Sequence, residues 1–236
     1  APDAALLLKL SQYDSALIAD EYGLNFPGRS NPPSPEAVGQ ANALLATAPQ
    51  ADLPRLIATV GDALWSSDET ALATLADEHG CASREDTEVR LNAATALRAQ
   101  LKHYSGAMFH YEGEWYWGID RLHYLEARLA ELGADRQSDQ PYVTQCPDVS
   151  VDGVHNASDL TLEFFPSLRS PYTSIVFDET IELAAKAGVE LVMRPVLPMV
   201  MRGVPATREK GMYIFSDTAR EARRRGVAYG NMYDPI

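Results

Sequence analysis

Ser170 is the residue whose type and position most clearly suggest chemistry. An apolar run at residues 160–165 predicts a strand before it, and residues 175–187 after it have the pattern of an amphipathic helix. Pro171 fits the first turn of that helix, where proline is favoured. A helix start offers unpaired N–H groups and a partial positive charge, so the Ser170 hydroxyl can face a thiolate, a carboxylate or a phosphate. It can equally serve as an ordinary helix cap.

The elements around Ser170 predict a βαβ unit. We expect the helix to end at Gly188, because glycine is favoured just after a helix end. Residues 189–195 form a second apolar run, which predicts another strand. Strand, turn, helix and strand in this order form a parallel pair with a helical crossover. Ser170 is therefore expected at the junction between the first strand and the helix.

A family resemblance rests on Phe164-Phe165, Ser170-Pro171-Tyr172-Thr173 and Arg194-Pro195. This pattern resembles the opening of the 2-hydroxychromene-2-carboxylate isomerases and kappa-class glutathione transferases, which belong to the DsbA-like branch of the thioredoxin superfamily. In that family the serine takes the place of the first cysteine of Cys-x-x-Cys and faces the glutathione sulfur. The resemblance gives Ser170 this catalytic role and puts Thr173 in the place of the second cysteine. A dithiol redox cycle therefore cannot run at this turn.

Residues 109–122 carry a second resemblance to the same family. Their sequence is Phe-His-Tyr-Glu-Gly-Glu-Trp-Tyr-Trp-Gly-Ile-Asp-Arg-Leu. It is similar to the family's closing hairpin and last helix, where an apolar strand is followed by Gly-Glu, two aromatic residues and Gly-x-Asp-Arg-Leu. The helical stretch at residues 53–79 resembles the family's all-α insertion.

Together the resemblances imply an α/β fold, with a thioredoxin-like sheet, a large all-α insertion of the DsbA-like kind, and the two halves in permuted order. Residues 1–132 correspond to the back half of a module, with the helical insertion at 4–102 and the hairpin and last helix at 107–132. Residues 133–159 are expected to form a linker, and residues 160–236 correspond to the front half.

This order has two explanations, a circular permutation or a window cut from a tandem repeat. Two segments align at a constant offset of 203 residues, with Asp14, Ala16, Ala19, Gly23, Leu24 and Phe26 matching Asp217, Ala219, Ala222, Gly226, Val227 and Tyr229. A clean permutation does not duplicate an element, so we favour the tandem origin over permutation and over chance similarity of two alanine-rich helices. In either case we expect the two halves to complete one sheet, within one chain or swapped between the chains of a homodimer.

The resemblance also implies a glutathione-binding set of Asp120, Arg121, Ala107, Met108 and Tyr172. Asp120 corresponds to the residue that holds the γ-glutamyl end, and a helix N-cap is its alternative role. Arg121 is either an anion contact or a surface residue. Ala107 stands at the family's cis-proline, and we expect it to follow a trans bond, because a cis bond before a non-proline residue costs about 2.5–4 kcal/mol.

Composition limits the partners. The formal net charge of −13 argues against nucleic acid, since phosphate binding needs a basic face. No apolar run approaches the length that crosses a bilayer, and the first residues do not resemble a signal peptide. Cys81 and Cys146 lie far apart, without metal-ligand spacing around them, so we expect two unrelated reduced thiols, no metal and a cytoplasmic protein. The chain does not begin with Met, which is consistent with a processed or trimmed product.

Periodicity and breaker residues predict the remaining elements. Helices are expected at residues 4–22, 36–48, 53–65, 68–79, 87–102 and 208–225, and another begins at the turn of residues 118–121 and runs to about residue 132. Strands are expected at residues 107–111 and 114–117, as a hairpin, and near Tyr142-Val143.

The leading functional hypothesis is a glutathione-dependent isomerase or transferase. Ser170 would hold the thiolate, which would act on an aromatic or otherwise conjugated acid. Two alternatives stay open. One is a non-catalytic thioredoxin-like scaffold or oligomerisation module. The other is a part of a longer thiol-disulfide oxidoreductase whose Cys-x-x-Cys lies elsewhere.

Overall fold

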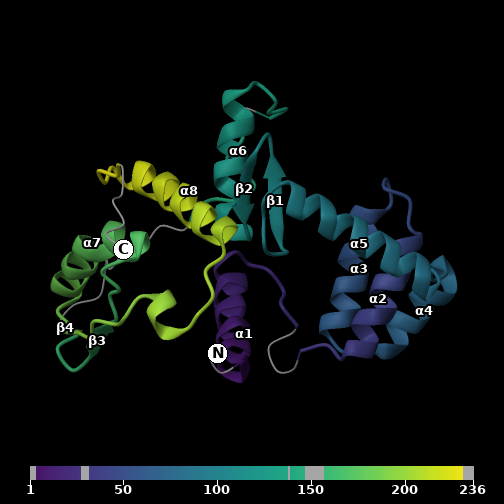
Figure 1. Cartoon of the computed structure of the whole chain (residues 1–236), viewed down its shortest axis with the longest axis horizontal. Helices are drawn as coiled ribbons and strands as arrows, with labels where there is room; N and C mark the ends of the chain where they lie inside the picture. The colour runs from purple at the N-terminus through teal and green to yellow at the C-terminus, as the bar shows by residue number, and fades with distance from the viewer. Residues whose placement is uncertain (1–3, 28–31, 138, 147–156, 231–236) are drawn as a thin grey trace. The chain divides into compact units, whose positions relative to one another are not determined.

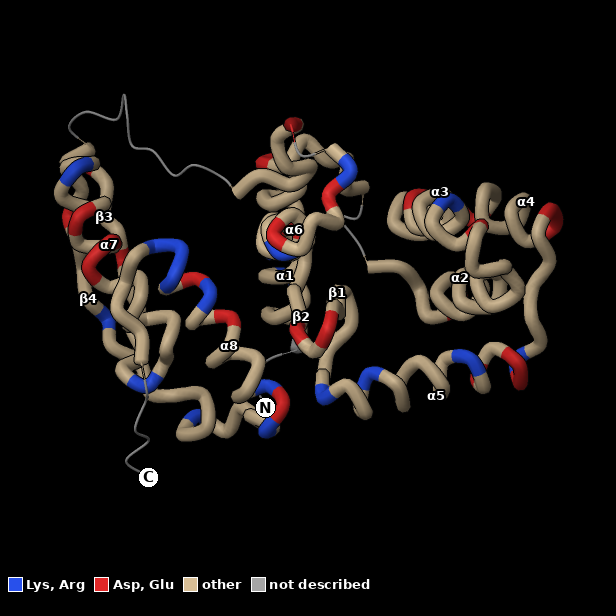
Figure 2. The backbone as a smooth tube through the Cα atoms, turned by 90° about the horizontal axis from the view of Figure 1, so that it is seen from above, with Lys and Arg blue, Asp and Glu red and all other residues tan. Residues whose placement is uncertain are grey.

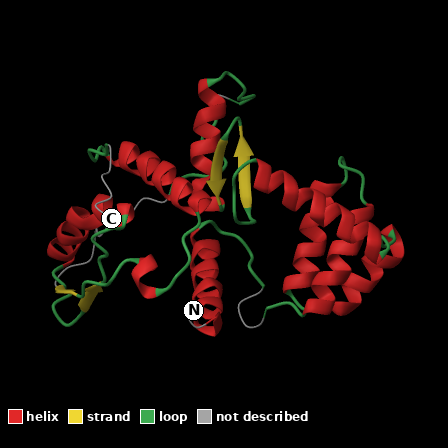
Figure 3. Cartoon of the chain, in the orientation of Figure 1, coloured by secondary structure: helices red, strands yellow, loops and turns green. Residues whose placement is uncertain are grey.

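A computed structural model of the chain describes residues 4–27, 32–137, 139–146 and 157–230. The protein is of mixed α/β class, with helices far outnumbering strands (Figures 1 and 3). It divides into two compact units, which we call the helical unit, Asp3–Lys102, and the mixed unit, His103–Ile236. No helix in the described ranges is both long and apolar enough to span a membrane.

The described residues of the helical unit form five helices: α1 (Ala4–Glu21), α2 (Pro35–Thr47), α3 (Leu53–Trp65), α4 (Glu69–His79) and α5 (Arg84–Gln100). Three of them begin at residues whose side chains accept a hydrogen bond from a backbone N–H of the first turn. These N-caps are Ser34 for α2, Asp68 for α4 and Ser83 for α5. The predicted helices are confirmed, and α5 begins three residues earlier than expected because Ser83 caps it.

The helical unit has an apolar core. Its centre consists of Leu44, Leu56, Val60 and Leu72, which are all at most 5% exposed. Three alanines complete the buried cluster: Ala41 in α2, Ala48 at the C-terminal end of α2, and Ala63 in α3. Alanines at these contacts let the helices approach closely, so that α2, α3 and α4 pack around one another.

The mixed unit begins with a hairpin of β1 (Met108–Tyr111) and β2 (Glu114–Trp117), paired antiparallel as predicted. Glu112 and Gly113 form its turn, and both have positive φ, 44° and 86°, as a tight hairpin turn of the I′ kind requires. The 3₁₀ turn η1 (Ile119–Arg121) and helix α6 (Leu122–Glu131) follow. Gly118 joins β2 to η1 at φ 72°, and a Cβ there would lie 3.1 Å from the Asp120 carboxylate. The junction therefore needs glycine.

The predicted βαβ unit is also confirmed. Strand β3 (Thr161–Phe164) pairs in parallel with β4 (Glu190–Met193), and α7 (Pro171–Ala187) connects them. Helix α7 begins at Pro171, which was expected in its first turn, and ends before Gly188, whose φ is 70°. The predicted loop after β4 holds a 3₁₀ turn, η2 (Met199–Arg202), before α8 (Arg208–Arg225).

The described residues of one chain do not form the single shared sheet that was expected within a chain, and its formation between two chains stays a prediction. The hairpin β1–β2 and the parallel pair β3–β4 are two separate two-stranded sheets. The segment that holds the hairpin and the segment that holds the parallel pair are connected by side-chain contacts among η1, α6, α7 and α8, and not by hydrogen bonds between strands. All of these elements belong to the mixed unit. Acidic and basic residues lie along much of α8 (Figure 2).

Part of the expected linker, residues 133–159, is bound to helix α6. The strand predicted near Tyr142-Val143 is absent from the described residues. The Glu126 carboxylate on α6 instead accepts the N–H groups of Val143 and Thr144, at 2.7 and 2.8 Å, so a charge-assisted pair takes the place of a strand ladder. Residues 147–156 of this segment lie outside the described residues.

Candidate functional site

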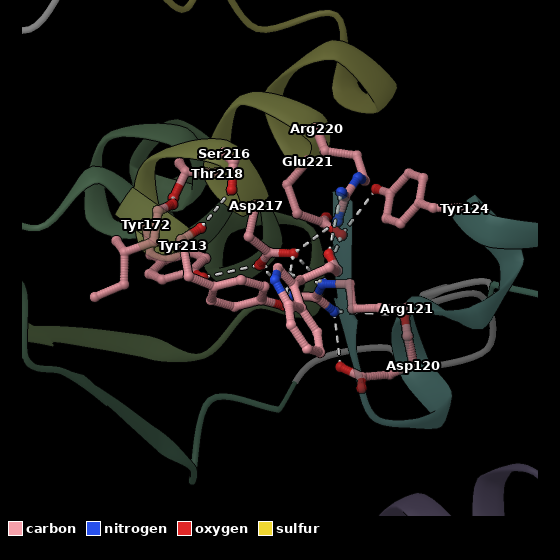
Figure 4. Close-up of polar contacts among 12 residues, drawn as sticks. Asp120, Arg121, Tyr124, Tyr172, Tyr213, Ser216, Asp217, Thr218, Arg220 and Glu221 are labelled. Carbon is pink, nitrogen blue, oxygen red and sulfur yellow. Dashed lines mark hydrogen bonds and ion pairs between the residues drawn. The ribbon is translucent and has the colours of Figure 1, made fainter. Parts of the chain in front are cut away.

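Asp217 on α8 is the centre of the most connected polar group in the mixed unit. Asp217 is only 1% exposed. The Tyr172 hydroxyl at the start of α7 donates to Asp217 Oδ2 at 2.8 Å, and Arg121 Nε of η1 donates to Oδ1 at 3.0 Å (Figure 4). The carboxylate therefore joins three elements that are far apart in the sequence. We call the group the Asp217 cluster, and it consists of Asp120, Arg121, Tyr124, Tyr172, Tyr213, Asp217, Arg220 and Glu221.

Arg121 makes several charge-assisted contacts in the cluster. Its Nη2 also donates to Asp217 Oδ2 at 3.2 Å, so the pair is forked, and its Nη1 donates to Asp120 Oδ2 at 2.7 Å. Burial alone would lower the pKa of Arg121, but the hydrogen bonds to Asp217 and the nearby carboxylates raise it further above its ordinary value. The guanidinium is thus permanently charged at this position.

Two further groups bind the same carboxylate from α8 itself. The Tyr213 hydroxyl lies 3.3 Å from Asp217 Oδ1, and Arg220 Nη1 lies 3.4 Å from it. Arg220 also donates to the Trp115 carbonyl at 3.3 Å, and its guanidinium carbon lies 4.4 Å from the centre of the Tyr116 ring. Arg220 therefore fastens α8 to strand β2.

Glu221 forms a second acidic point one turn further along α8. Tyr124 of α6 donates to Glu221 Oε1 at 2.8 Å, and Arg224 Nη2 donates to Oε2 at 3.3 Å. Burial by itself would raise the pKa of Glu221, but the hydrogen bond from Tyr124 and the Arg121 and Arg224 charges lower it overall. Glu221 is consequently ionised and holds α6 against α8.

The tyrosines of the cluster are held as neutral hydrogen-bond donors. Burial raises the pKa of Tyr172 above its ordinary value, and the Asp217 charge raises it further. The same two causes, in the same order, raise the pKa of Tyr213. Neither hydroxyl is therefore suited to act as a base near neutral pH.

Ser170 lies at the predicted place, as the residue that precedes α7. Its backbone is extended, with φ −86° and ψ 121°, and Pro171 occupies the first turn. Its hydroxyl makes no capping hydrogen bond to the helix within the described chain, so the ordinary cap role is not realised. The Thr173 side chain accepts the Ser167 N–H through its Oγ1 at 3.2 Å.

Asp120 and Arg121 lie together as predicted, but two alternative roles for them are wrong. Asp120 is not the N-cap of α6, because Arg121 occupies that position. Arg121 is not a surface residue, because its side chain is 21% exposed and paired with Asp217. The Asp120 side chain is 42% exposed. Burial raises the pKa of its carboxyl, while the Arg121 charge opposes that rise.

Ala107 and Met108 lie at the start of the hairpin. Met108 is the first residue of β1 and pairs with Trp117. No cis peptide bond occurs among the described residues, so the trans bond expected before Ala107 is confirmed. Ala107 has φ 54°, a left-handed conformation that L-residues other than glycine seldom adopt. The hydrogen bonds described above for the Asp217 cluster involve neither Ala107 nor Met108.

The structure thus brings Asp120, Arg121 and Tyr172 into one cluster, with Ser170 two residues before Tyr172. The residues that complete it were not predicted from the sequence: Tyr124, Tyr213, Asp217, Arg220 and Glu221. Their only signal was the spacing of Tyr213, Asp217 and Glu221, four residues apart on a helix, which puts three polar side chains on one face. On a highly charged helix this spacing is also typical of a solvated face.

The cluster has no arrangement typical of a metal centre. No three His, Cys, Asp or Glu side chains within the described ranges are placed to hold a metal ion. Its carboxylates are instead matched with guanidinium and phenol donors. Comparisons with protein-family models, with curated proteins and with solved structures gave no match for this chain.

Proposed function

We propose that the chain is a glutathione-dependent isomerase or transferase, in which the Ser170 hydroxyl holds the bound thiol at the N-terminus of α7. The observation that carries this proposal is the Ser170 hydroxyl, which does not cap the helix that it precedes. The hydroxyl of a serine at the start of a helix commonly accepts a hydrogen bond from a backbone N–H of the first turn. Here the hydroxyl and the positive end of a 17-residue helix stay available to a ligand.

The expected binding residues fit glutathione unequally. Ser170 fits the thiol. One carboxylate oxygen of Asp120 is in the ion pair with Arg121, but the Asp120 side chain is 42% exposed, so its carboxylate also fits an ammonium group such as that of the γ-glutamyl end. Arg121 and Tyr172 do not fit as direct ligands, since Asp217 holds both. We assign them a positioning role, in which they fix the start of α7 next to η1.

The division of labour follows from these contacts. Bound glutathione supplies a nucleophilic thiolate when it is present. The start of α7 lowers the pKa of a nearby thiol through its dipole, and the Ser170 hydroxyl donates a hydrogen bond to the thiolate form. The substrate class that matches such a nucleophile is an aromatic or otherwise conjugated acid. Glutathione at high concentration is typical of the cytoplasm, which is therefore our proposed location.

We further propose that the chain derives from tandem thioredoxin-like, DsbA-like modules, holding the back half of one and the front half of the next. The ends of α1 and α8 are compatible with this, because Gly23 and Gly226 both have positive φ, 63° and 67°, although Gly133 and Gly188 after α6 and α7 share this feature. Helices α1 and α8 close with the same hydrogen bond, from Leu24 N to Ala19 O at 2.7 Å and from Val227 N to Ala222 O at 2.9 Å. These positions have the constant offset noted in the sequence.

A second candidate function is a non-catalytic thioredoxin-like module. It is favoured by the left-handed Ala107 with a trans bond before it, in the loop that pairs with the tripeptide in the resembling family. The full use of Arg121 and Tyr172 in the Asp217 cluster also favours it.

Thermal unfolding with increasing glutathione separates the two candidates. For the enzyme, the midpoint should rise with the logarithm of glutathione concentration, and Asp120→Ala should weaken this response. Glu112→Ala, at the exposed hairpin turn, is the matched control and should leave the response unchanged. No shift at about 10 mM glutathione would favour the non-catalytic module.

A further inference from the structure

The outer face of α1 has an apolar stripe with the spacing of a coiled-coil seam. Leu6, Leu10, Tyr13 and Leu17 follow one another at intervals of four, three and four residues. Their exposed fractions are 64%, 61%, 66% and 50%. Alternating intervals of three and four place side chains on one narrow stripe, where they act as knobs for the holes of a facing helix. Ala19, which is 6% exposed, lies on the other side of α1, so the stripe faces away from the covered side.

The matching stripe on α8 has different chemistry. At the offset of 203 residues, the stripe positions of α8 are Glu209, Tyr213, Ser216 and Arg220. Tyr213 and Arg220 bind Asp217, and Arg220 also binds β2. Leucines at the corresponding positions of α1 cannot replace these hydrogen bonds. The α1 stripe is therefore suited to an apolar partner and not to a polar surface of the kind that α8 covers.

We propose that α1 pairs with α1 of a second copy of the chain as a parallel two-helix coiled coil. A stripe that has the seam spacing on one helix is self-complementary, as a two-fold dimer requires. In the heptad notation Leu10 and Leu17 occupy a positions, and Leu6 and Tyr13 occupy d positions.

The charges beside the stripe select the parallel orientation. Lys9 occupies a g position and Asp14 an e position, on opposite sides of the stripe. In a parallel pair, g of one helix meets the next e of the other, so Lys9 and Asp14 form two symmetric attractive pairs. In an antiparallel pair, g meets g and e meets e, so neither residue meets an opposite charge.

The seam spans two heptads, which is short for a coiled coil. We therefore expect a reversible dimer that dissociates on dilution. This interface goes beyond the proposed enzyme site, because it uses only α1 and no residue of the Asp217 cluster.

Sedimentation equilibrium of the full chain, from about 5 to about 500 μM, measures the association directly. The mean mass should rise from monomer toward dimer over this range. Leu10→Glu should weaken association by about a hundredfold, because one buried leucine is lost from each helix. Leu8→Glu is the matched control. Leu8 is 44% exposed on the side opposite the stripe, so its substitution should leave association unchanged.

Charge substitutions test the orientation. Lys9→Glu alone and Asp14→Lys alone each turn two attractive pairs into two repulsive ones, so each should weaken self-association by about tenfold. Mixing the two variants restores both attractive pairs and should produce a heterodimer of wild-type strength. High salt should reduce these differences.

Three results would overturn the proposal. The first is a monomer mass over the whole range. The second is a dimer that Leu10→Glu does not weaken. The third is a monomer whose thermal stability falls with Leu10→Glu, because then the chain itself covers the stripe.

Discussion

The two units of the molecule differ in how many polar groups their interiors hold. The helical unit buries leucines, a valine and alanines, led by Leu44 at 0% exposed. The mixed unit also buries apolar residues, such as Ile175 and Ala222, but it adds a group of buried polar side chains: Asp217, Thr218 and Glu221 on α8, with His103 and His123. An apolar interior gains free energy in proportion to the apolar surface removed from water, and this gain does not depend on directed contacts. A polar interior gains little on balance, but loses much when one partner is removed.

This difference assigns a separate task to each unit. The apolar core of the helical unit accounts for its stability without any specific chemistry. The Asp217 cluster specifies how η1, α6, α7 and α8 meet, and thereby fixes the helix start that bears Ser170. We therefore expect changes of charge and pH to act on the mixed unit, and changes of volume to act on the helical unit.

The largest expected effect comes from Asp217→Ala. It leaves the Arg121 guanidinium largely buried without its main partner, which costs about 3–5 kcal/mol of unfolding free energy. Hydrogen exchange followed by peptide should show faster exchange in α6 and α8, with α2 to α4 unchanged. Asp14→Ala, at the corresponding exposed position of α1, is the control and should cost less than about 0.5 kcal/mol. Equal effects of the two substitutions would mean that the cluster does not hold the mixed unit together.

Leu44→Ala should produce the reverse pattern. Removing a fully buried leucine from the helical core costs about 2–5 kcal/mol. Exchange should accelerate in α2, α3 and α4 while α8 stays protected. Ile57→Ala, at a position that is 52% exposed on α3, is the matched control and should have a much smaller effect. Accelerated exchange in both units would contradict their independence.

Acidification should weaken the mixed unit through His123. Its ring is 7% exposed, and neither ring nitrogen has a hydrogen-bond partner among the described residues. Burial lowers the pKa of His123, and the Arg224 charge lowers it further, against the opposing effect of Glu221. A lowered folded-state pKa means that the unfolded chain binds the proton more readily, so stability is lost as pH falls below the ordinary histidine value of about 6.5.

The corresponding measurement is the unfolding midpoint of a Trp65→Phe variant, whose remaining tryptophans, Trp115 and Trp117, report only on the mixed unit. Between about pH 7.5 and 5.5 the midpoint should fall. His123→Phe should flatten this slope, whereas His110→Phe, at an exposed position on β1, should not. Asp120 acts in the opposite direction, because its pKa is raised, but only at lower pH. A slope that persists in His123→Phe would assign the pH dependence to other groups.

The smallest expected effect is a gain in stability from Ala107→Gly. Ala107 has φ 54°, and glycine adopts this conformation without the steric cost of a Cβ, which is about 1–2 kcal/mol. Glycine also loses more chain entropy on folding, which offsets part of this gain. We therefore expect the free energy of unfolding of the mixed unit, measured by denaturant titration, to rise by about 0.5–1 kcal/mol. Ala107→Val should destabilise the unit, and a neutral result for both would indicate that the loop relaxes.

Local signals in the sequence predicted most elements but not their assembly. Gly23, Gly188 and Gly226 ended helices as expected, and Glu112-Gly113 made the hairpin turn. The βαβ unit followed from two apolar runs around an amphipathic helix. These features depend on a few neighbouring residues, so a single sequence is enough to predict them.

The features that were missed depend on distant partners. Arg121 and Asp217 are 96 residues apart, and nothing near either residue indicates the other. The failure of the strand near Tyr142-Val143 has the same origin, because Glu126 of α6 binds these N–H groups. The separation of the two sheets likewise depends on tertiary packing and not on local propensity.

The most direct test of the proposed site is the ultraviolet absorbance of the glutathione thiolate, titrated against pH with the wild-type chain and with Ser170→Ala. In the wild type, bound glutathione should ionise at a lower pH than free glutathione, because the start of α7 and the Ser170 hydroxyl favour the thiolate. In Ser170→Ala the thiol pKa of bound glutathione should move back toward its value in free solution. The free energy of unfolding should stay within about 1 kcal/mol of wild type. A wild-type chain in which the thiol ionises as it does in free solution, or a Ser170→Ala variant with unchanged ionisation, would contradict the proposed role of Ser170.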